Sequence, residues 1–352
     1  MKKFVLAVLL LLTVVFFITR AAELQTLLET IQQADWRFIA LAMLVQFVWL
    51  LNVAASAYTI HRALGLDVRF GRIALLTGAS TFVNIITPAA GMGGIGIFVN
   101  EARQKKYSVI RVMVASGVYA LLEYVGFACV LMVGLVILLR RNNLNIPELI
   151  ASAILLTGIG ILGYLLYLGM YSPKKMGVFL ARLARIANLL VHPFLRRDYF
   201  DERRAHLFAY EAGSGLKLLR RQPKNLILPG ALALSSKFLL MLVLFLVFLA
   251  FKAPVTLGTL VAGFSVGNLF NIVSPTPSGI GIVEGTLTLA LASLRVPLAV
   301  ATVVALVYRG IVFWLPLFLG MVTFRWIMHS GREQQPEAAT RGQPVLNEQL
   351  RD

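Results

Sequence analysis

The sequence predicts an all-α polytopic membrane protein with six full transmembrane helices and two re-entrant helical hairpins arranged as an inverted repeat. Of its 352 residues, 59% are hydrophobic and only 14% are charged, and the mean hydropathy is +0.81. Soluble domains carry about 25% charged residues, so this composition disfavours a soluble globular protein. The apolar residues come in blocks of 16 to 31, and a helix of about 20 residues spans a bilayer core.

The first apolar block, residues 4–19, follows two lysines and ends at Arg20. Because no small-x-small cleavage site precedes Arg20, this pattern predicts an uncleaved signal anchor with a cytoplasmic N-terminus. Residues 1–35 are therefore expected to form the anchor and an external linker.

Five further blocks predict full spans at 36–60, 112–139, 149–171, 225–251 and 298–328. Two other blocks, 73–99 and 259–292, contain proline and glycine. Proline removes a backbone donor and glycine relaxes the chain, so we expect hairpins that enter and leave on the same side. The predicted break residues are Pro88, Gly94 and Gly96 in the first hairpin, and Pro275, Pro277, Gly279 and Gly281 in the second.

The net charge of +17 gathers on one predicted side of the membrane. Residues 172–224 hold 12 Lys and Arg against 4 Asp and Glu, and residues 62–111 add seven more Lys and Arg. Cytoplasmic loops carry such an excess, which places both termini and the basic loops in the cytoplasm of a plasma (bacterial inner) membrane. The polybasic segment can also rest on anionic headgroups, at ~1 kcal/mol per residue. Arg140 and Arg141 are the exception on the outer side, and the polar tail 329–352 is expected to be disordered.

Two short motifs recur along the chain. Asn84-Ile-Ile-Thr-Pro88 recurs as Asn271-Ile-Val-Ser-Pro275, offset by 187, and the Gly-Ile-Gly-Ile at 94–97 recurs at 279–282, offset by 185. The units 36–139 and 225–328, separated by 140–224, each contain 104 residues. One unit begins outside and the other inside, which predicts an inverted repeat. Inverted repeats with broken helices point to a transport site, and the alternative is a duplication retained for packing.

Four ionisable residues stand out well inside the predicted membrane segments, where each costs ~2.5–3.5 kcal/mol and is a functional candidate. They are Glu123, Lys237, Glu284 and Arg309. Glu123 and Arg309 hold nearly equivalent repeat positions, which predicts a central pair or a shared ligand site. In the functional interpretation, Arg309 and Lys237 receive a lipid phosphate and Glu123 accepts an amine or a proton. The alternative is a structural salt bridge between the repeats.

Carboxylates and amides also flank the predicted breaks. Glu101 and Glu284 follow glycine-rich turns, where a carboxylate can cap a new half-helix or help to hold a headgroup or a coupling proton. Asn84, Asn268 and Asn271 can satisfy freed carbonyls or contact a ligand.

The segment Ser-Pro-Thr-Pro-Ser-Gly-Ile-Gly-Ile-Val-Glu at 274–284, followed by Tyr308-Arg309 and Trp314-Leu315-Pro316, resembles the transmembrane region of lysylphosphatidylglycerol synthases. The resemblance covers roughly residues 1–330. It implies a multi-pass plasma-membrane protein, like the stand-alone flippase-like members, that translocates a lipid between leaflets. Glu123-Tyr124 departs from the Glu-Arg of many relatives. Only 24 residues follow the last span, so the aminoacyl-transferase chemistry of the full-length synthases is not expected here.

The sequence contains no P-loop, Gly-x-Ser-x-Gly or His-Glu-x-x-His motif, which disfavours an enzyme. With one cysteine and four histidines, we expect no metal and no cofactor. The predicted function is translocation of a polar or anionic, including aminoacylated, phospholipid through a groove between the repeats, with phospholipids and not nucleic acid as partners. Three alternatives stay open: a catalytic or accessory subunit of lipid headgroup synthesis, a small-solute transporter, and a partner of a lipid-synthesis enzyme that docks on residues 172–224.

Overall fold

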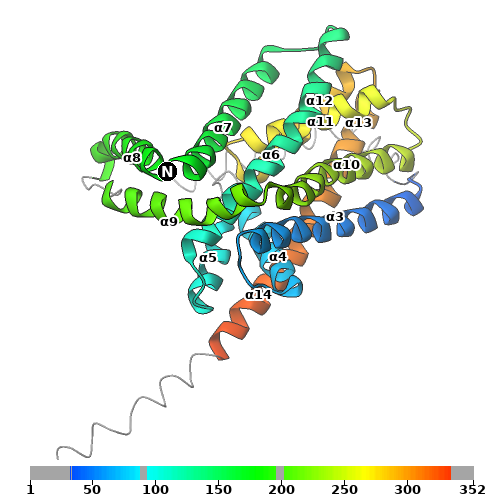
Figure 1. The fold of residues 1–352 in the computed structure, drawn as a ribbon. Coiled ribbons are helices and arrows are strands. Elements are labelled where there is room, and N and C mark those ends of the chain that lie inside the picture. The colour runs from blue at the N-terminus through cyan, green and yellow to red at the C-terminus, as the bar shows by residue number, and fades with distance from the viewer. Residues whose placement is uncertain (1–31, 33, 88–92, 196–201, 334–352) are drawn as a thin grey trace, which may run out of the picture.

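The structure, a computed structural model, describes residues 32, 34–87, 93–195 and 202–333. The described residues form helices joined by turns, without strands (Figure 1). The predicted signal anchor and Pro88 lie outside the described residues.

Five helices of the described part are long and apolar enough to cross a membrane. They are α3 (Trp36–Ala63), α6 (Val109–Arg140), α7 (Ile146–Tyr171), α10 (Ile227–Ala250) with the short η1 (Pro223–Leu226) before it, and a last helix that comprises α13 (Leu298–Arg309), the π-helical turn η3 (Gly310–Trp314) and α14 (Leu315–Glu333). Each coincides with a predicted span. The last helix continues to Glu333, so the first five residues of the tail predicted to be disordered are helical.

Proline and side-chain caps explain several of these boundaries. The carboxylate of Asp35 accepts the N–H of Arg37 at the start of α3, and the hydroxyl of Ser108 accepts the N–H of Arg111 at the start of α6. Both satisfy donors that a helix start leaves unpaired. Pro316 has no N–H to offer the carbonyl of Val312, which accounts for the π-helical turn beside Arg309.

The two interrupted blocks form pairs of short helices. The first pair is α4 (Phe70–Ile86) and α5 (Ile95–Gln104), and the second is α11 (Leu257–Val273) and α12 (Ile282–Ser293), with η2 (Pro277–Gly279) between them. The bounds of α4 and α11, and the starts of α5 and α12, are all 187 residues apart. By the helix starts, Gly94 therefore corresponds to Gly281 and not to Gly279, the glycine with which the offset of 185 aligned it. Gly96 lies inside α5 and not in the break.

Helices from the two halves of the chain pack against each other in pairs. Helix α3 runs along α10, α4 packs on α14, and α11 packs on α6 (Figure 1). The N–H of Asp35 donates to the carbonyl of Ala250 at 2.8 Å, so α3 and α10 are antiparallel.

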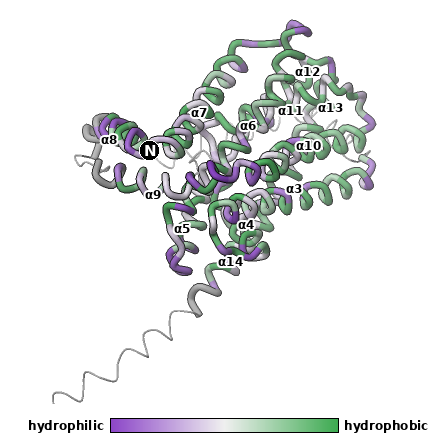
Figure 2. Tube along the Cα trace, viewed as in Figure 1, coloured by the Kyte–Doolittle hydropathy of each residue, from purple (hydrophilic) through white to green (hydrophobic). Residues whose placement is uncertain are grey.

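One end of the molecule, here termed the basic end, carries the end of α3, the start of α6, the end of α7 and a pair of further helices. These are α8 (Pro173–Leu195) and α9 (Glu202–Arg221), so the basic segment 172–224 is largely helical. Ile60, Val114, Leu166 and Leu216 share a buried cluster there. Hydrophobic residues cover most of α3, α7 and α10, whereas hydrophilic residues gather at helix ends and on α8 and α9 (Figure 2).

The opposite end is held by contacts among the ends of α6, α11 and α12. The guanidinium of Arg141, the apparent exception in the charge distribution, donates to the hydroxyls of Thr256 and Thr259 at 3.2 and 3.1 Å. The amide of Asn143 donates to the carbonyl of Ser293 at 2.9 Å. Arg141 thus has a specific structural role at the start of α11.

Candidate functional site

The two interrupted blocks meet where each is broken. The hydroxyl of Ser278 in η2 donates to the carbonyl of Ile85 at the end of α4, at 3.5 Å. Across the first break, the side-chain oxygen of Asn84 accepts the N–H of Gly94 at 2.7 Å. A Cβ on Gly94 would lie 2.6 Å from the carbonyl oxygen of Ser80, so only glycine permits this close approach of α5 to α4.

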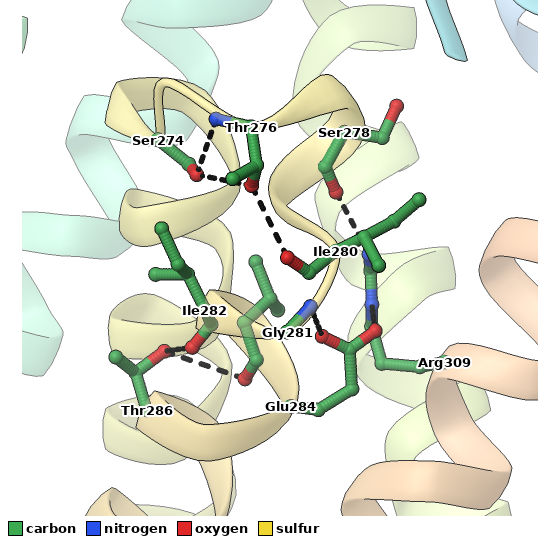
Figure 3. Close-up of polar contacts among 10 residues, drawn as sticks. Ser274, Thr276, Ser278, Ile280, Gly281, Ile282, Glu284, Thr286 and Arg309 are labelled. Carbon is green, nitrogen blue, oxygen red and sulfur yellow. Dashed lines mark hydrogen bonds and ion pairs between the residues drawn. The ribbon is translucent and has the colours of Figure 1, made fainter. Parts of the chain in front are cut away.

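The second break is a tight polar turn (Figure 3). The hydroxyl of Thr276 donates to the carbonyl of Ile280 at 3.2 Å, and Gly279 and Gly281 have φ of +70° and +80°, which glycine adopts without strain. Glu284 Oε2 accepts the N–H of Gly281 at 2.7 Å. The predicted cap at the start of α12 is thereby confirmed for Glu284.

Arg309 joins this turn to the last long helix (Figure 3). Its Nε donates to Glu284 Oε1 at 3.0 Å, and its Nη2 donates to the carbonyl of Ser278 at 2.7 Å. Its guanidinium lies 5.3 Å from the ring centre of Phe313. These contacts use two of its five N–H donors. The side chain is only 8% exposed. The guanidinium is therefore a buried cation whose remaining N–H groups are available to donate to an anion.

Glu123 on α6 has a different partner from the predicted one. Its Oε2 lies 2.5 Å from Lys237 Nζ on α10, and the hydroxyl of Ser236 donates to the same oxygen at 3.2 Å. The predicted direct pair of Glu123 with Arg309 is wrong, because each is paired elsewhere. Similar repeat positions place side chains at matching depths, whereas contact is decided by which helix packs beside them, here α10 beside α6.

Glu101 also differs from its predicted place. It lies in the last turn of α5, which begins at Ile95, so it does not cap the start of that helix. Its two carboxylate oxygens accept Nε and Nη2 of Arg72 at 2.8 and 2.6 Å. Arg72, assigned to a basic loop from the sequence, lies in α4. This pair joins the start of α4 to the end of α5.

A cavity of about 700 Å³ lies between the two broken helices and the long helices beside them. The predicted site residues that line it are Asn84, Glu123, Lys237, Asn268, Asn271 and Arg309. Glu284 and Glu101 are not part of the lining, but Glu284 contacts the lining residue Arg309. Five of the seven residues predicted to bind a substrate thus share one cavity: Asn84, Glu123, Lys237, Asn271 and Arg309.

Asn271 and three further lining residues carry unpaired polar atoms. Trp49 Nε1, His61 Nε2, Thr77 Oγ1 and Asn271 Oδ1 are buried and have no hydrogen-bond partner within the described residues. A buried polar atom left unpaired costs about 1–3 kcal/mol. The charged groups of Glu123, Lys237 and Arg309 in the same lining favour a polar occupant, either water or a ligand headgroup.

Sequence reasoning missed Trp49 and His61. The predicted span ends at residue 60, directly before His61, yet His61 is buried in α3, with Nδ1 2.7 Å from the carbonyl of Ala57 and its ring stacked on Phe98. The available signal was spacing: Trp49, Val53, Ala57 and His61 recur every four residues, which places them on one face of a helix.

Among the described residues, no group of three or more His, Cys, Asp and Glu side chains could hold a metal ion.

The family described as "Lysylphosphatidylglycerol synthase TM region" matches residues 4–320. The chain belongs to this family. Most of the described structure, including the cavity and both broken helices, lies within the matched range.

One relative comes from Methanothermobacter thermautotrophicus and is named "UPF0104 membrane protein". It is 20% identical to the chain over 311 residues, which cover 87% of the chain and 90% of the relative. The similarity therefore extends over almost the full length of both proteins. The name of the relative says that it is a membrane protein.

Proposed function

We propose that this protein moves a phospholipid with a polar or anionic headgroup, including an aminoacylated one, between the leaflets of the membrane without altering it chemically. The observation that carries the proposal is the single cavity that both broken helices share with buried Arg309, Lys237 and Glu123. Its volume of about 700 Å³ falls in the range of small-ligand sites and suits a headgroup, while the acyl chains stay in the bilayer.

The proposed membrane arrangement has six spans, with residues 4–19 as the first, and two re-entrant hairpins. The constant offset of 187 between the short helices supports an inverted repeat. The Arg72–Glu101 pair supports a first hairpin that returns to the basic end, and the contacts of Arg141 and Asn143 support a second that returns to the opposite end. By its charge, the basic end is the cytoplasmic one in the bacterial inner membrane, and both termini lie there.

The paired charges suggest how a headgroup is accommodated. A phosphate accepts hydrogen bonds from the unused N–H groups of Arg309 and from Lys237, and an amine of the headgroup replaces Lys237 at Glu123. Charge-assisted hydrogen bonds of this kind are stronger than neutral ones. The headgroup therefore exchanges one buried pair for another, so no charge has to stay unpaired in the membrane, where that is costly.

The test is lipid exchange in liposomes that contain the purified protein and headgroup-labelled phosphatidylglycerol, lysyl-phosphatidylglycerol or phosphatidylcholine. We expect protein-dependent exchange for at least one headgroup, and a loss of at least about tenfold in Arg309→Met, since one charged hydrogen bond to a buried group contributes about 1.5–3 kcal/mol. Arg69→Met is the matched control, because Arg69 is exposed at the basic end.

Three results would contradict the proposal: no exchange with any headgroup, a chemically altered lipid in mass spectrometry, or full exchange by a folded Arg309→Met protein. Arg309→Lys keeps the charge but loses the planar fork. It should fold and show intermediate exchange, which keeps the test informative if the methionine variant is unstable.

A further inference from the structure

A second, shallower groove lies between α7 and α8 at the basic end of the molecule. Its volume is about 350 Å³, and it is separate from the central cavity. One wall carries the cations Lys174, Lys175 and Arg182, and the other residues that matter here are Tyr164, Val178 and Phe179. The rings of Tyr164 and Phe179 meet edge to face at 5.8 Å, so the aromatic wall joins the two helices.

The charge of the groove has one sign. No acidic side chain lines it, and its three cations have no ion-pair partner within the part of the chain that the structure describes. The surrounding segment 172–224 carries an excess of eight positive charges. The groove therefore complements an anion and would repel a cationic ligand.

Exposed tyrosines indicate the level in the membrane at which the groove lies. Tyr164, Tyr167 and Tyr171, in the last turns of the α7 span, are 52%, 55% and 54% exposed. Tyrosines on the outside of a spanning helix concentrate at the level of lipid headgroups. Since α8 begins at Pro173, directly after this belt, Lys174 and Lys175 lie at the level where phosphates of the adjacent leaflet are found.

The groove also has an apolar side that a soluble anion would leave unused. Val178 is 46% exposed beside the cations, and Leu183 and Ile186 are 40% and 55% exposed further along α8. A helix with basic and apolar residues interleaved in this way lies in the membrane interface, with its apolar side chains among acyl chains. A ligand that fits both sides has an anionic head and a hydrocarbon tail.

We propose that the groove between α7 and α8 binds one anionic phospholipid of the adjacent leaflet. Its phosphate lies among Lys174, Lys175 and Arg182, and the first part of an acyl chain lies against Tyr164 and Val178. This lipid is a docked partner of the helix pair α8–α9 and does not enter the central cavity. The inference holds whether or not the central cavity moves lipid.

The test is native mass spectrometry of the full-length protein titrated with phosphatidylglycerol or phosphatidylcholine in detergent. The groove variant is Lys174→Gln/Lys175→Gln/Arg182→Gln. The matched control is Arg103→Gln/Lys105→Gln/Arg111→Gln, which removes the same charge from the basic end, outside the groove. We expect phosphatidylglycerol to bind the groove variant at least about tenfold more weakly than the wild type or the control, since each cation near a headgroup contributes to binding.

A second pair of measurements identifies the source of the anion. Glycerol 3-phosphate, which lacks acyl chains, should not displace phosphatidylglycerol at equal concentration, and Val178→Ser, which removes apolar surface without adding charge, should weaken phosphatidylglycerol binding. The proposal is overturned if the groove and control variants lose affinity equally, if phosphatidylcholine binds as tightly as phosphatidylglycerol, or if glycerol 3-phosphate competes fully.

Discussion

The two broken helices share short sequence motifs and a common offset of 187 at the bounds of α4 and α11 and at the starts of α5 and α12, but they are held by different contacts. In the first, Arg72 and Glu101 join the start of α4 to the end of α5, with Arg72 34% exposed. In the second, Glu284 and Arg309 join the turn at the break to the following long helix, at the edge of the central cavity. The first pair closes the base of its own hairpin, whereas the second brings a cation to the cavity.

The equivalent N–H groups of Gly94 and Gly281 show where this difference begins. Asn84 caps Gly94, whereas Glu284 caps Gly281. Asn271, which corresponds to Asn84 at the offset of 187, is thereby left with an unpaired side-chain oxygen at the cavity wall. The position that corresponds to Glu284 is Ile97. One carboxylate in the second half thus frees an amide that the first half uses for structure.

The largest expected effect concerns the pair that joins the halves, Glu123 and Lys237. Glu123→Ala leaves the buried ammonium of Lys237 without its carboxylate, which costs about 3–5 kcal/mol. We expect a clearly lower thermal unfolding midpoint in detergent. The double variant Glu123→Gln/Lys237→Met removes both charges and should recover most of the loss. If the double variant is as unstable as Glu123→Ala, the loss does not come from an unpaired lysine.

The next effect compares glycines of the first hairpin. A methyl group on Gly94 meets the backbone of Ser80, whereas one on Gly96 meets nothing within 4 Å. Gly94→Ala should therefore destabilise the protein by about 1–3 kcal/mol through overpacking. Gly96→Ala, inside α5, should be neutral or stabilising by up to about 1 kcal/mol. Thermal unfolding of the two variants measures this difference, and equal midpoints would show that α5 does not approach α4 as closely as described.

Much of the fold could be predicted from the sequence, because a helix that spans the bilayer needs about 20 apolar residues, and these runs are visible in the sequence. Both breaks were also predictable, since proline and glycine act locally. The partners of the charged residues were not. Which side chain faces Glu123 depends on the packing of α6 against α10, more than 100 residues away in the chain. Sequence periodicity records the buried face of each helix, but it does not record which helix covers that face.

The smallest expected effect tests the exchange of caps between the two hairpins. Asn84→Ala removes the acceptor for the N–H of Gly94 and should lower stability by about 1 kcal/mol, as the loss of a helix cap does.

Asn271→Ala removes an oxygen that has no partner among the described residues, so its thermal midpoint should stay within experimental error of the wild type. Its lipid exchange in liposomes should nevertheless fall, because the cavity lining loses the polar side chain of Asn271. A stability loss equal to that of Asn84→Ala would mean that both asparagines serve the fold. An unchanged exchange rate in a stable Asn271→Ala protein would mean that the freed amide does not contact the headgroup.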